Sequence, residues 1–269
     1  MKPQESLAQQ EYIRQQKQRH TVVTVSRVLL LFLLLALWEI SASLGWIDDF
    51  IFSSPSRMTL CFIGMVEDKT IFLHIGITLA ETLISFFLVT AVGILGAVLL
   101  WSSKSLSEIL EPYLVMLNSL PKSALAPILI VWLGSNMRTI IVAAISVAVF
   151  GSILTLHNGF SGMDPDQIKL IRSLGGTKKD VLWKVLLPGS IPLIVSNMKV
   201  NIGLCLVGVI IGEFLAADKG LGFLIIYGSQ VFALDMVIMS IVILCILSAL
   251  LYQGITILEQ KSQQAGKRQ

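Results

Sequence analysis

Residues 164–192 read DPDQIKLIRSLGGTKKDVLWKVLLPGSIP and form the one long polar, helix-patterned stretch between hydrophobic segments. Asp164 is expected to cap a helix, because its side chain can accept a hydrogen bond from the free N–H groups of the first turn. Pro165 suits the first helical position, where no N–H is needed. Gly175 is expected to end this helix, since glycine adopts the left-handed C-terminal conformation without a side-chain clash.

A second helix is expected directly after the glycines. Thr177 can cap it, with Asp180 three residues later as in a capping box. Pro188 and Pro192 are expected to break the chain after this helix, because proline lacks the N–H that continues a helix. The stretch therefore predicts two short amphipathic helices joined by a glycine elbow, a shape that suits a lipid surface or a partner protein.

The composition around this stretch indicates a membrane protein. Of the 269 residues, 55% are hydrophobic and 14% are charged, and the mean hydropathy is +0.81. So little charge cannot cover a water-facing surface, and the apolar runs approach the about 20 residues that cross a bilayer. The net charge of +3 gives no support for nucleic-acid binding. We predict an all-α integral membrane fold with transmembrane helices near residues 28–47, 71–101, 113–133, 139–156, 190–216 and 234–258, about six in all.

The predicted domain organisation is a tail over residues 1–27, a transmembrane domain over 28–258 and a second tail over 259–269. The two-helix loop, residues 162–188, lies between the fourth and fifth spans. With six spans, fourteen Lys and Arg residues fall on the side that holds both tails and this loop, and four fall on the other side. Since cytoplasmic segments carry the excess of positive charge, we expect both termini and the loop in the cytoplasm.

Signatures of catalysis and of metal binding are missing from the sequence. No Gly-rich phosphate loop ends in Gly-Lys-Ser/Thr, and the 3 His and 3 Cys residues are scattered without catalytic or metal-ligand spacing. We therefore expect no catalytic residue, no metal site and no cofactor on this chain, and no ATP hydrolysis by it.

The polar loop resembles the cytoplasmic loop of permease subunits of bacterial ATP-binding-cassette (ABC) importers. That loop carries Glu-Ala-Ala, three residues, Gly, nine residues and Ile-x-Leu-Pro. This chain matches the spacing with Gly175, Leu187 and Pro188, and has Lys-Leu-Ile in place of Glu-Ala-Ala. From about Ser53 onward it is similar to the nitrate, sulfonate, taurine and bicarbonate branch of the binding-protein-dependent transport inner-membrane component family. The supporting stretches are SLPKSALAPILIVWLG (119–134), GEFLAADKGLGFLI (212–225) and ILEQ (257–260).

The resemblance implies two permease copies, expected as a homodimer in the bacterial cytoplasmic membrane. It also implies two ABC ATPase subunits that hold ATP and magnesium, and an external solute-binding protein that supplies the substrate. The ATPases would move the loop as a lever while the spans alternate access. An alternative to docking on an ATPase is that the basic residues of the loop form a solvated face against anionic lipid headgroups. The residues expected to couple to the ATPase are Ile168, Lys169, Ile171, Arg172, Leu174, Gly175, Thr177, Leu187 and Pro188.

Polar residues within or near the spans are candidates for the translocation pathway. A charged residue in the middle of a bilayer costs about 2.5–3.5 kcal/mol on insertion scales, so such residues usually face protein or water. The resemblance implies a basic residue at position 81, where this chain carries Glu81. A salt bridge from Glu81 to Lys122 or Lys199 and a contact with substrate are both open. The candidates are Glu81, Asn118, Ser119, Lys122, Lys199 and Glu213.

Structural roles compete with the pathway role at several of these positions. Pro121 predicts a kink at residues 118–122, and the same break can line a pathway, because freed carbonyl groups need a cavity or protein neighbours. Glu213 is compatible with an external gate or with a structural cap. Gly208 and Gly212, four residues apart, predict close packing of the fifth span against another helix.

The favoured function is a permease subunit of an ATP-driven importer for a small organic or inorganic anion such as a sulfonate, taurine or nitrate. An importer of a vitamin precursor of the hydroxymethylpyrimidine type, or of riboflavin, is an alternative within the same class. A proton-coupled secondary carrier that uses Glu81 or Glu213 is an alternative of a different class, and a membrane scaffold is a third.

Overall fold

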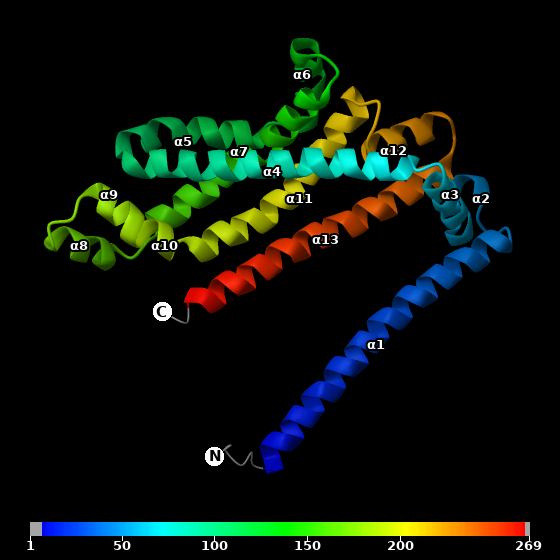
Figure 1. Cartoon of the computed structure of the whole chain (residues 1–269), viewed down its shortest axis with the longest axis horizontal. Helices are drawn as coiled ribbons and strands as arrows, with labels where there is room; N and C mark the ends of the chain where they lie inside the picture. Colours follow the sequence, from blue (N-terminus) through cyan, green and yellow to red (C-terminus); the bar gives the residue numbers. More distant parts are fainter. Residues whose placement is uncertain (1–6, 267–269) are drawn as a thin grey trace.

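The computed structural model describes residues 7–266, and every regular element in this range is a helix (Figure 1). The all-α prediction is therefore confirmed. The first part comprises α1 (Leu7–Ser43), α2 (Asp49–Phe52), α3 (Pro55–Glu67), α4 (Thr70–Ser102), α5 (Lys104–Ser119), the 3-10 turn η1 (Lys122–Ala124), α6 (Ala126–Leu133) and α7 (Met137–Ser161). The second part comprises α8 (Pro165–Ser173), α9 (Lys178–Val181), the π turn η2 (Leu182–Leu186), α10 (Leu187–Gly189), α11 (Ile191–Ala216), α12 (Leu221–Gln230) and α13 (Leu234–Gly266).

Five helices in the described residues are long and apolar enough to cross a membrane, and α5 with α6 supplies a sixth span if the pair is counted as one. The prediction of about six spans is confirmed. The kink predicted at residues 118–122 of the third span is present, because α5 and α6 meet at an angle of 80°. Pro121 lies at this break, where its missing N–H ends α5. The third span also begins earlier than the predicted residue 113: α5 starts at Lys104, where Ser103 accepts a hydrogen bond from the N–H of Leu106.

The centre of the bundle consists of α4, α7 and α11, which pack on one another. Gly208 of α11 lies against α7, where an added Cβ would be 2.6 Å from the Cα of Ala144. Gly212 lies one turn further along α11, where an added Cβ would be 3.0 Å from the Cα of Ile140. The predicted close packing at this glycine pair is therefore confirmed, and α7 is its partner helix.

Two further layers lie on either side of this centre. α12, α13 and α3 pack together through a second apolar cluster that includes Leu221, Leu224 and Met239. On the other side α5 covers α4 and α7. α1 contacts α2 and α3 and then runs away from the bundle (Figure 1), and no residue of its apolar part, Thr21–Ser43, is buried.

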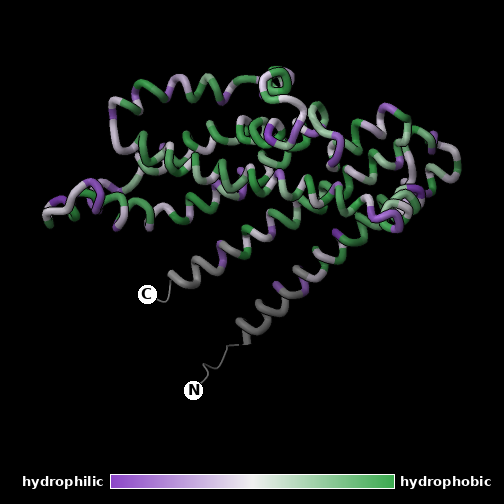
Figure 2. The backbone as a smooth tube through the Cα atoms, turned by 45° about the horizontal axis from the view of Figure 1, so that its top comes forward, coloured by the Kyte–Doolittle hydropathy of each residue, from purple (hydrophilic) through white to green (hydrophobic). Residues whose placement is uncertain are grey.

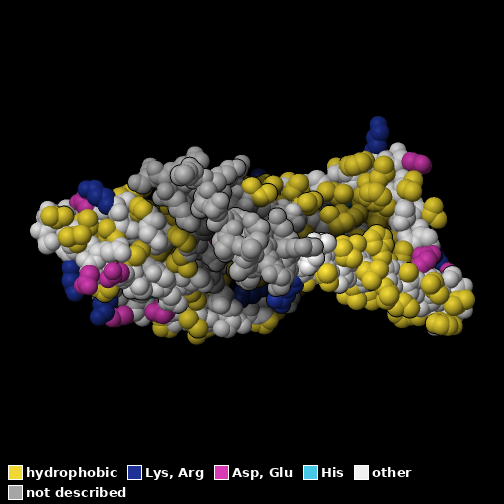
Figure 3. Space-filling model, turned by 90° about the horizontal axis from the view of Figure 1, so that it is seen from below, with side chains coloured by type: hydrophobic (Ala, Val, Ile, Leu, Met, Phe, Trp, Pro, Cys, Tyr) yellow, Lys and Arg dark blue, Asp and Glu magenta, His cyan; other side chains and the backbone are white. Residues whose placement is uncertain are grey.

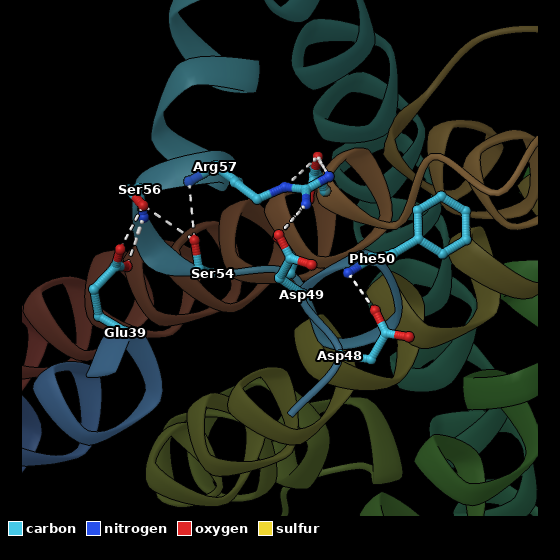
Figure 4. A network of polar contacts seen from close by, with 9 residues as sticks. Glu39, Asp48, Asp49, Phe50, Ser54, Ser56 and Arg57 are labelled. Atoms are coloured by element: carbon cyan, nitrogen blue, oxygen red, sulfur yellow. Dashed lines mark hydrogen bonds and ion pairs between the residues drawn. The ribbon is translucent and has the colours of Figure 1, made fainter. Parts of the chain in front are cut away.

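A polar network joins α1, α2, α3 and α13 where these helices meet (Figure 4). Glu39 accepts hydrogen bonds from the backbone N–H and the hydroxyl of Ser56, at 3.0 and 2.5 Å. Arg57 forms ion pairs with Asp235 at 3.0 Å and Asp49 at 2.8 Å. The hydrogen bond to Asp235 is the main cause that raises the pKa of Arg57, and the hydrogen bond to Asp49 is the next largest. This network holds the short helices against the first turn of α13.

The long helices place the polar loop at one end of the molecule. The end of α13 and the segment α8–α10 lie toward the left in Figure 1, whereas α2, α3 and α12 lie toward the right and the start of α1 lies at the bottom near the middle. Figure 2 shows mostly hydrophobic residues along the long helices and hydrophilic residues in α8 and α9. The predicted tails extend over residues 1–6 and 267–269, which lie outside the described residues.

Candidate functional site

The first helix of the polar loop forms as its local sequence predicts. The carboxylate of Asp164 accepts a hydrogen bond of 2.9 Å from the N–H of Asp166, and Pro165 opens α8. Gly175 has a φ of +83°, the left-handed region that favours glycine. The N–H of Gly176 then donates to the carbonyl of Ile171 at 2.9 Å, so that the chain reverses tightly at the end of the helix.

The second helix begins with the predicted capping box. The hydroxyl of Thr177 accepts from the N–H of Asp180 at 3.3 Å, and the carboxylate of Asp180 accepts from the N–H of Thr177 at 2.9 Å. Lys184 adds an ion pair of 2.8 Å to the same carboxylate. The hydrogen bond from Lys184 is the main cause that lowers the pKa of Asp180, and the hydrogen bonds from Thr177 add to it. The helix therefore starts at a carboxylate that stays ionised well into acid solution.

The expected break before the fifth span falls at Ser190, between Pro188 and Pro192, and each proline itself lies within a helix. The chain stays helical through α9, η2 and α10 because the backbone widens into a π turn, in which the N–H of Leu187 donates to the carbonyl of Leu182. A wider turn leaves room for the ring of Pro188, which would clash in a regular α-helix. Pro192 does not break the chain either, since it lies in the first turn of α11, and the bend falls at Ser190.

The second helix anchors the loop to the bundle. Val181 and Leu186 are fully buried, and Leu186 packs in a cluster with Leu156 and Phe160 of α7. We call the segment from α8 to α10 the hairpin. Its large apolar side chains on the opposite side are open to the surroundings, with exposed fractions of 59% for Leu170, 76% for Leu174 and 69% for Trp183.

Charged side chains surround these exposed apolar groups. In Figure 3 lysine, arginine, aspartate and glutamate side chains gather at the left-hand end of the molecule, around the hairpin. All nine residues predicted to couple to an ATPase lie on the hairpin. Six of them are exposed, namely Lys169, Arg172, Leu174, Gly175, Thr177 and Pro188, while Ile168, Ile171 and Leu187 are half-buried. The hairpin thus has a second helix anchored to the bundle through Val181 and Leu186, and an exposed surface with both apolar and positively charged side chains.

The polar residues of the third span lie at the elbow between α5 and α6. The ammonium group of Lys122 donates a hydrogen bond to the carbonyl of Asn118, which the break leaves without a helical partner. The hydroxyl of Ser119 donates to the carbonyl of Val115 at 2.9 Å. Asn118 lies beside Gly151 of α7. The elbow is therefore stabilised by its own side chains, and its outer face is exposed.

Glu81 and Glu213 lie together inside the bundle, with exposed fractions of 1% and 0%. Glu213 accepts a hydrogen bond from Thr78, which lies one helical turn before Glu81 on the same face of α4. Of the two alternatives left open for Glu81, the salt bridge to Lys122 or Lys199 is not formed, because the packing of α4 on α11 brings a second acid near Glu81 and the two lysines have other partners.

Glu213 also caps α12. Its carboxylate accepts hydrogen bonds from the hydroxyl of Thr78, at 2.7 Å, and from the N–H of Gly222. Thr78 in turn accepts from the N–H of Leu221 at 2.8 Å. Because Gly220 has no side chain, these two residues from α4 and α11 satisfy the free N–H groups at the start of α12. The geometry at Glu213 is that of a structural cap.

Lys199 lies apart from these acids. Its ammonium group forms an ion pair with Glu259 of α13 and lies 5.8 Å from the ring centre of Tyr252. The six pathway candidates therefore fall into three groups by their contacts: the elbow, the Glu81 and Glu213 pair, and the ion pair between α11 and α13. The structure of this chain does not bring them into one site.

The sequence analysis missed a buried polar cluster at the centre of the bundle. The side-chain amides of Asn197 and Asn201 donate to the hydroxyl of Ser152 at 2.7 and 3.0 Å, and all three residues are buried. The available signal was the spacing of the two asparagines, four residues apart in an apolar span, which places them on one helix face. This cluster fixes α11 against α7.

The fold and the sequence can be compared with known proteins. Residues 89–264 match the family described as "Binding-protein-dependent transport system inner membrane component". The taurine transport system permease protein of Escherichia coli (strain K12) is 25% identical over 234 residues, which cover 85% of this chain and 85% of that protein. The formylaminopyrimidine transport permease protein of Halalkalibacterium halodurans is 26% identical over 191 residues, 71% of this chain and 76% of that protein.

A solved structure shares the fold. The inward-facing MetNI methionine ABC transporter contains a chain that superposes with a TM-score of 0.62 at 21% identity, over 69% of this chain and 92% of that chain. The family match covers more than half of the chain. The protein therefore belongs to the inner membrane components of binding-protein-dependent transport systems, the multi-pass permease subunits of ABC importers.

Proposed function

We propose that this permease carries a small organic anion of the sulfonate class, and that its hairpin couples transport to a separate ATPase subunit. Similarity to the taurine permease over 85% of the chain supports the substrate class. ATP and magnesium would be bound by the ATPase, and an external solute-binding protein would deliver the anion. The observation that carries the coupling role is the exposure of Leu174 and Trp183 on a hairpin whose base is buried.

The hairpin suits a protein partner better than a lipid surface. A helix that lies on lipid turns one continuous apolar face toward the membrane. Here the apolar face of the second helix is already occupied, because Val181 and Leu186 pack inside the bundle. Leu170 and Leu174, near the glycine elbow, and Trp183 of η2 remain exposed, so a groove in a neighbouring protein is the simplest cover for them. Movement of that groove would pass through Leu186 directly to α4 and α7.

We place the hairpin and both termini in the cytoplasm, on the distribution of Lys and Arg in the sequence. The proposed assembly has two copies of this chain, two ATPase subunits and one binding protein. A second copy would cover the outer face of the α5–α6 elbow, where Tyr113, Val131 and Trp132 are exposed. The polar groups of residues 118–122 lie on the same elbow and would line a pathway between the copies, since lipid tails cannot satisfy them.

The coupling role is tested with single charges on the exposed surface of the hairpin. The chain is produced with the ATPase and the binding protein encoded beside it, and the complex is purified and placed in lipid vesicles. Leu174→Glu and Trp183→Glu should each reduce recovery of the ATPase and ATP-driven taurine uptake by at least about tenfold, the effect of losing an interface hot spot. Trp46→Glu is the matched control, because Trp46 is equally exposed, at 74%, in the turn after α1. Wild-type recovery of the ATPase with both hairpin variants would refute the coupling role.

The substrate is tested separately on the purified binding protein. Tight binding of taurine or an alkyl sulfonate, with no binding of a formylaminopyrimidine, supports the anion assignment. The reverse result replaces it with the vitamin-precursor alternative and leaves the coupling role untouched. Uptake by this chain alone under a pH gradient, without an ATPase, would instead support a proton-coupled carrier.

A further inference from the structure

Two acids meet in the interior of the bundle without a base between them. Glu81 of α4 and Glu213 of α11 are almost fully enclosed, and Glu213 accepts a hydrogen bond from Thr78, one helical turn before Glu81 on α4. Among the described residues, no ion pair joins a lysine or arginine to either carboxyl group. Two ionised carboxylates buried this near each other without a base would repel each other and lack solvation, so one of the two must hold a proton.

The hydrogen bonds around the pair indicate which acid carries the proton. Glu213 accepts from the hydroxyl of Thr78 and from the N–H of Gly222, which suits an ionised carboxylate. Glu81 has a buried oxygen, Oε2, with no hydrogen-bond partner. An ionised group with such an oxygen is far more costly to bury than a neutral one, so the proton belongs on Glu81.

The other titratable groups nearby do not neutralise the pair. His74, also on α4, is engaged with the backbone of Gly220. Asp218 and Lys219 are exposed in the turn between α11 and α12. From α13, Asp235 is bound to Arg57. From α7, the neighbours of the last turns of α11 include Ile140 and Ala144, which are apolar.

We propose that Glu81 and Glu213 form a proton-binding site in which one shared proton holds α4, α11 and the start of α12 together. Glu213 is the link, because its carboxylate is bound to α4 through Thr78, one turn from Glu81, and caps α12 through the N–H of Gly222. The fit around it is close, since a Cβ on Gly220 would be 2.4 Å from its carboxyl group. Release of the proton places two negative charges side by side, and their repulsion displaces the carboxylate from the start of α12. This site is independent of the substrate and of the ATPase.

Infrared spectroscopy of the purified full chain in detergent tests for the proton. A protonated carboxylic acid has a carbonyl stretch that a carboxylate lacks, and exposed glutamates lose it above their ordinary pKa of about 4.3. At neutral pH the wild type should keep one such band, and Glu81→Gln should lose it. Glu67→Gln, a change at an exposed glutamate, should leave the band in place. Absence of the band from the wild type, or its persistence in Glu81→Gln, would overturn the proposal.

Hydrogen exchange of residues 217–224 tests the link to α12, with rates corrected for the intrinsic pH dependence of exchange. As the pH rises and the band disappears, protection in the wild type should fall about tenfold, the size expected for losing one hydrogen bond to a charged group. Glu81→Gln should stay protected at every pH, because a neutral amide at position 81 has no proton to release and leaves Glu213 as the one carboxylate there. Protection that is independent of pH in the wild type, or lost in Glu81→Gln, would contradict the proposed role.

Discussion

Gly176 lies so close to Ile171 that a Cβ at position 176 would be 2.5 Å from the Cγ2 atom of Ile171 and 2.8 Å from its carbonyl oxygen. Its neighbour Gly175 has open space around it and needs glycine for a different reason, its φ of +83°. The two glycines of the hairpin therefore fail in different ways when substituted. One substitution creates a clash, and the other creates backbone strain.

We predict that Gly176→Ala opens the hairpin more than Gly175→Ala does. The added methyl meets backbone at position 176, which typically costs about 1–3 kcal/mol. Alanine at position 175 carries the left-handed penalty of about 1–2 kcal/mol, and Gly175→Asn should cost less because Asn tolerates this conformation. Hydrogen exchange of residues 165–181 measures both effects. Equal protection in Gly176→Ala and the wild type would show that the contact with Ile171 does not constrain the turn.

The capping box predicts how the second hairpin helix responds to acid. Lys184 and Thr177 lower the pKa of Asp180 in the folded chain. Its stabilising effect is therefore complete above the ordinary pKa of aspartate, about 3.9, and is lost as the pH falls through the lowered value. Exchange protection of residues 177–186 should decrease in that range and be independent of pH in Asp180→Asn. Loss of exchange protection in the wild type only above pH 4 would contradict a lowered pKa of Asp180.

The hairpin could be predicted from sequence because its determinants are local. Asp164 caps α8 through Asp166, and Thr177 pairs with Asp180, all within three residues. Such contacts depend on the backbone of a single turn, so the residue types at a given spacing are enough to predict them. The π turn before Pro188 could not be predicted in the same way, because a proline at such a position usually ends an α-helix and π turns are rare.

The partners of the charged groups could not be predicted in the same way. Glu81 and Glu213 are 132 positions apart in the sequence, and Lys199 and Glu259 are 60 apart. Which of these meet depends on which helices pack together and with what rotation, and the hydrophobic pattern of a membrane span gives little information on either. Hence the sequence identified Glu81, Lys199 and Glu213 as unusual, but the salt bridge that it left open for Glu81 is not formed. The cluster at Ser152 was not predicted because it depends on the packing of α11 against α7.

We predict that Lys199 has a structural role between α11 and α13. Lys199→Met should lower the melting temperature of the purified chain, because the ion pair that joins α11 to α13 is lost. The exchanged pair Lys199→Glu with Glu259→Lys should recover most of the loss and retain uptake. Failure of the exchange to restore uptake, with normal stability, would return Lys199 to the translocation pathway.

Gly208 and Gly203 offer a matched test of how closely α11 must approach α7. Both are glycines inside α11, but a Cβ at Gly208 would be 2.6 Å from the Cα of Ala144, whereas a Cβ at Gly203 would meet nothing within 4 Å. Gly208→Ala should destabilise the chain by about 1–3 kcal/mol, since backbone must move to relieve the contact. Gly203→Ala should be neutral or stabilising by up to about 1 kcal/mol, because alanine favours the helix. Thermal unfolding in detergent distinguishes the two, and equal melting temperatures would mean that α7 and α11 adjust freely. In that case the glycine spacing would not set the distance between the two helices, and the hydrogen bonds from Asn197 and Asn201 to Ser152 would be left as the main constraint.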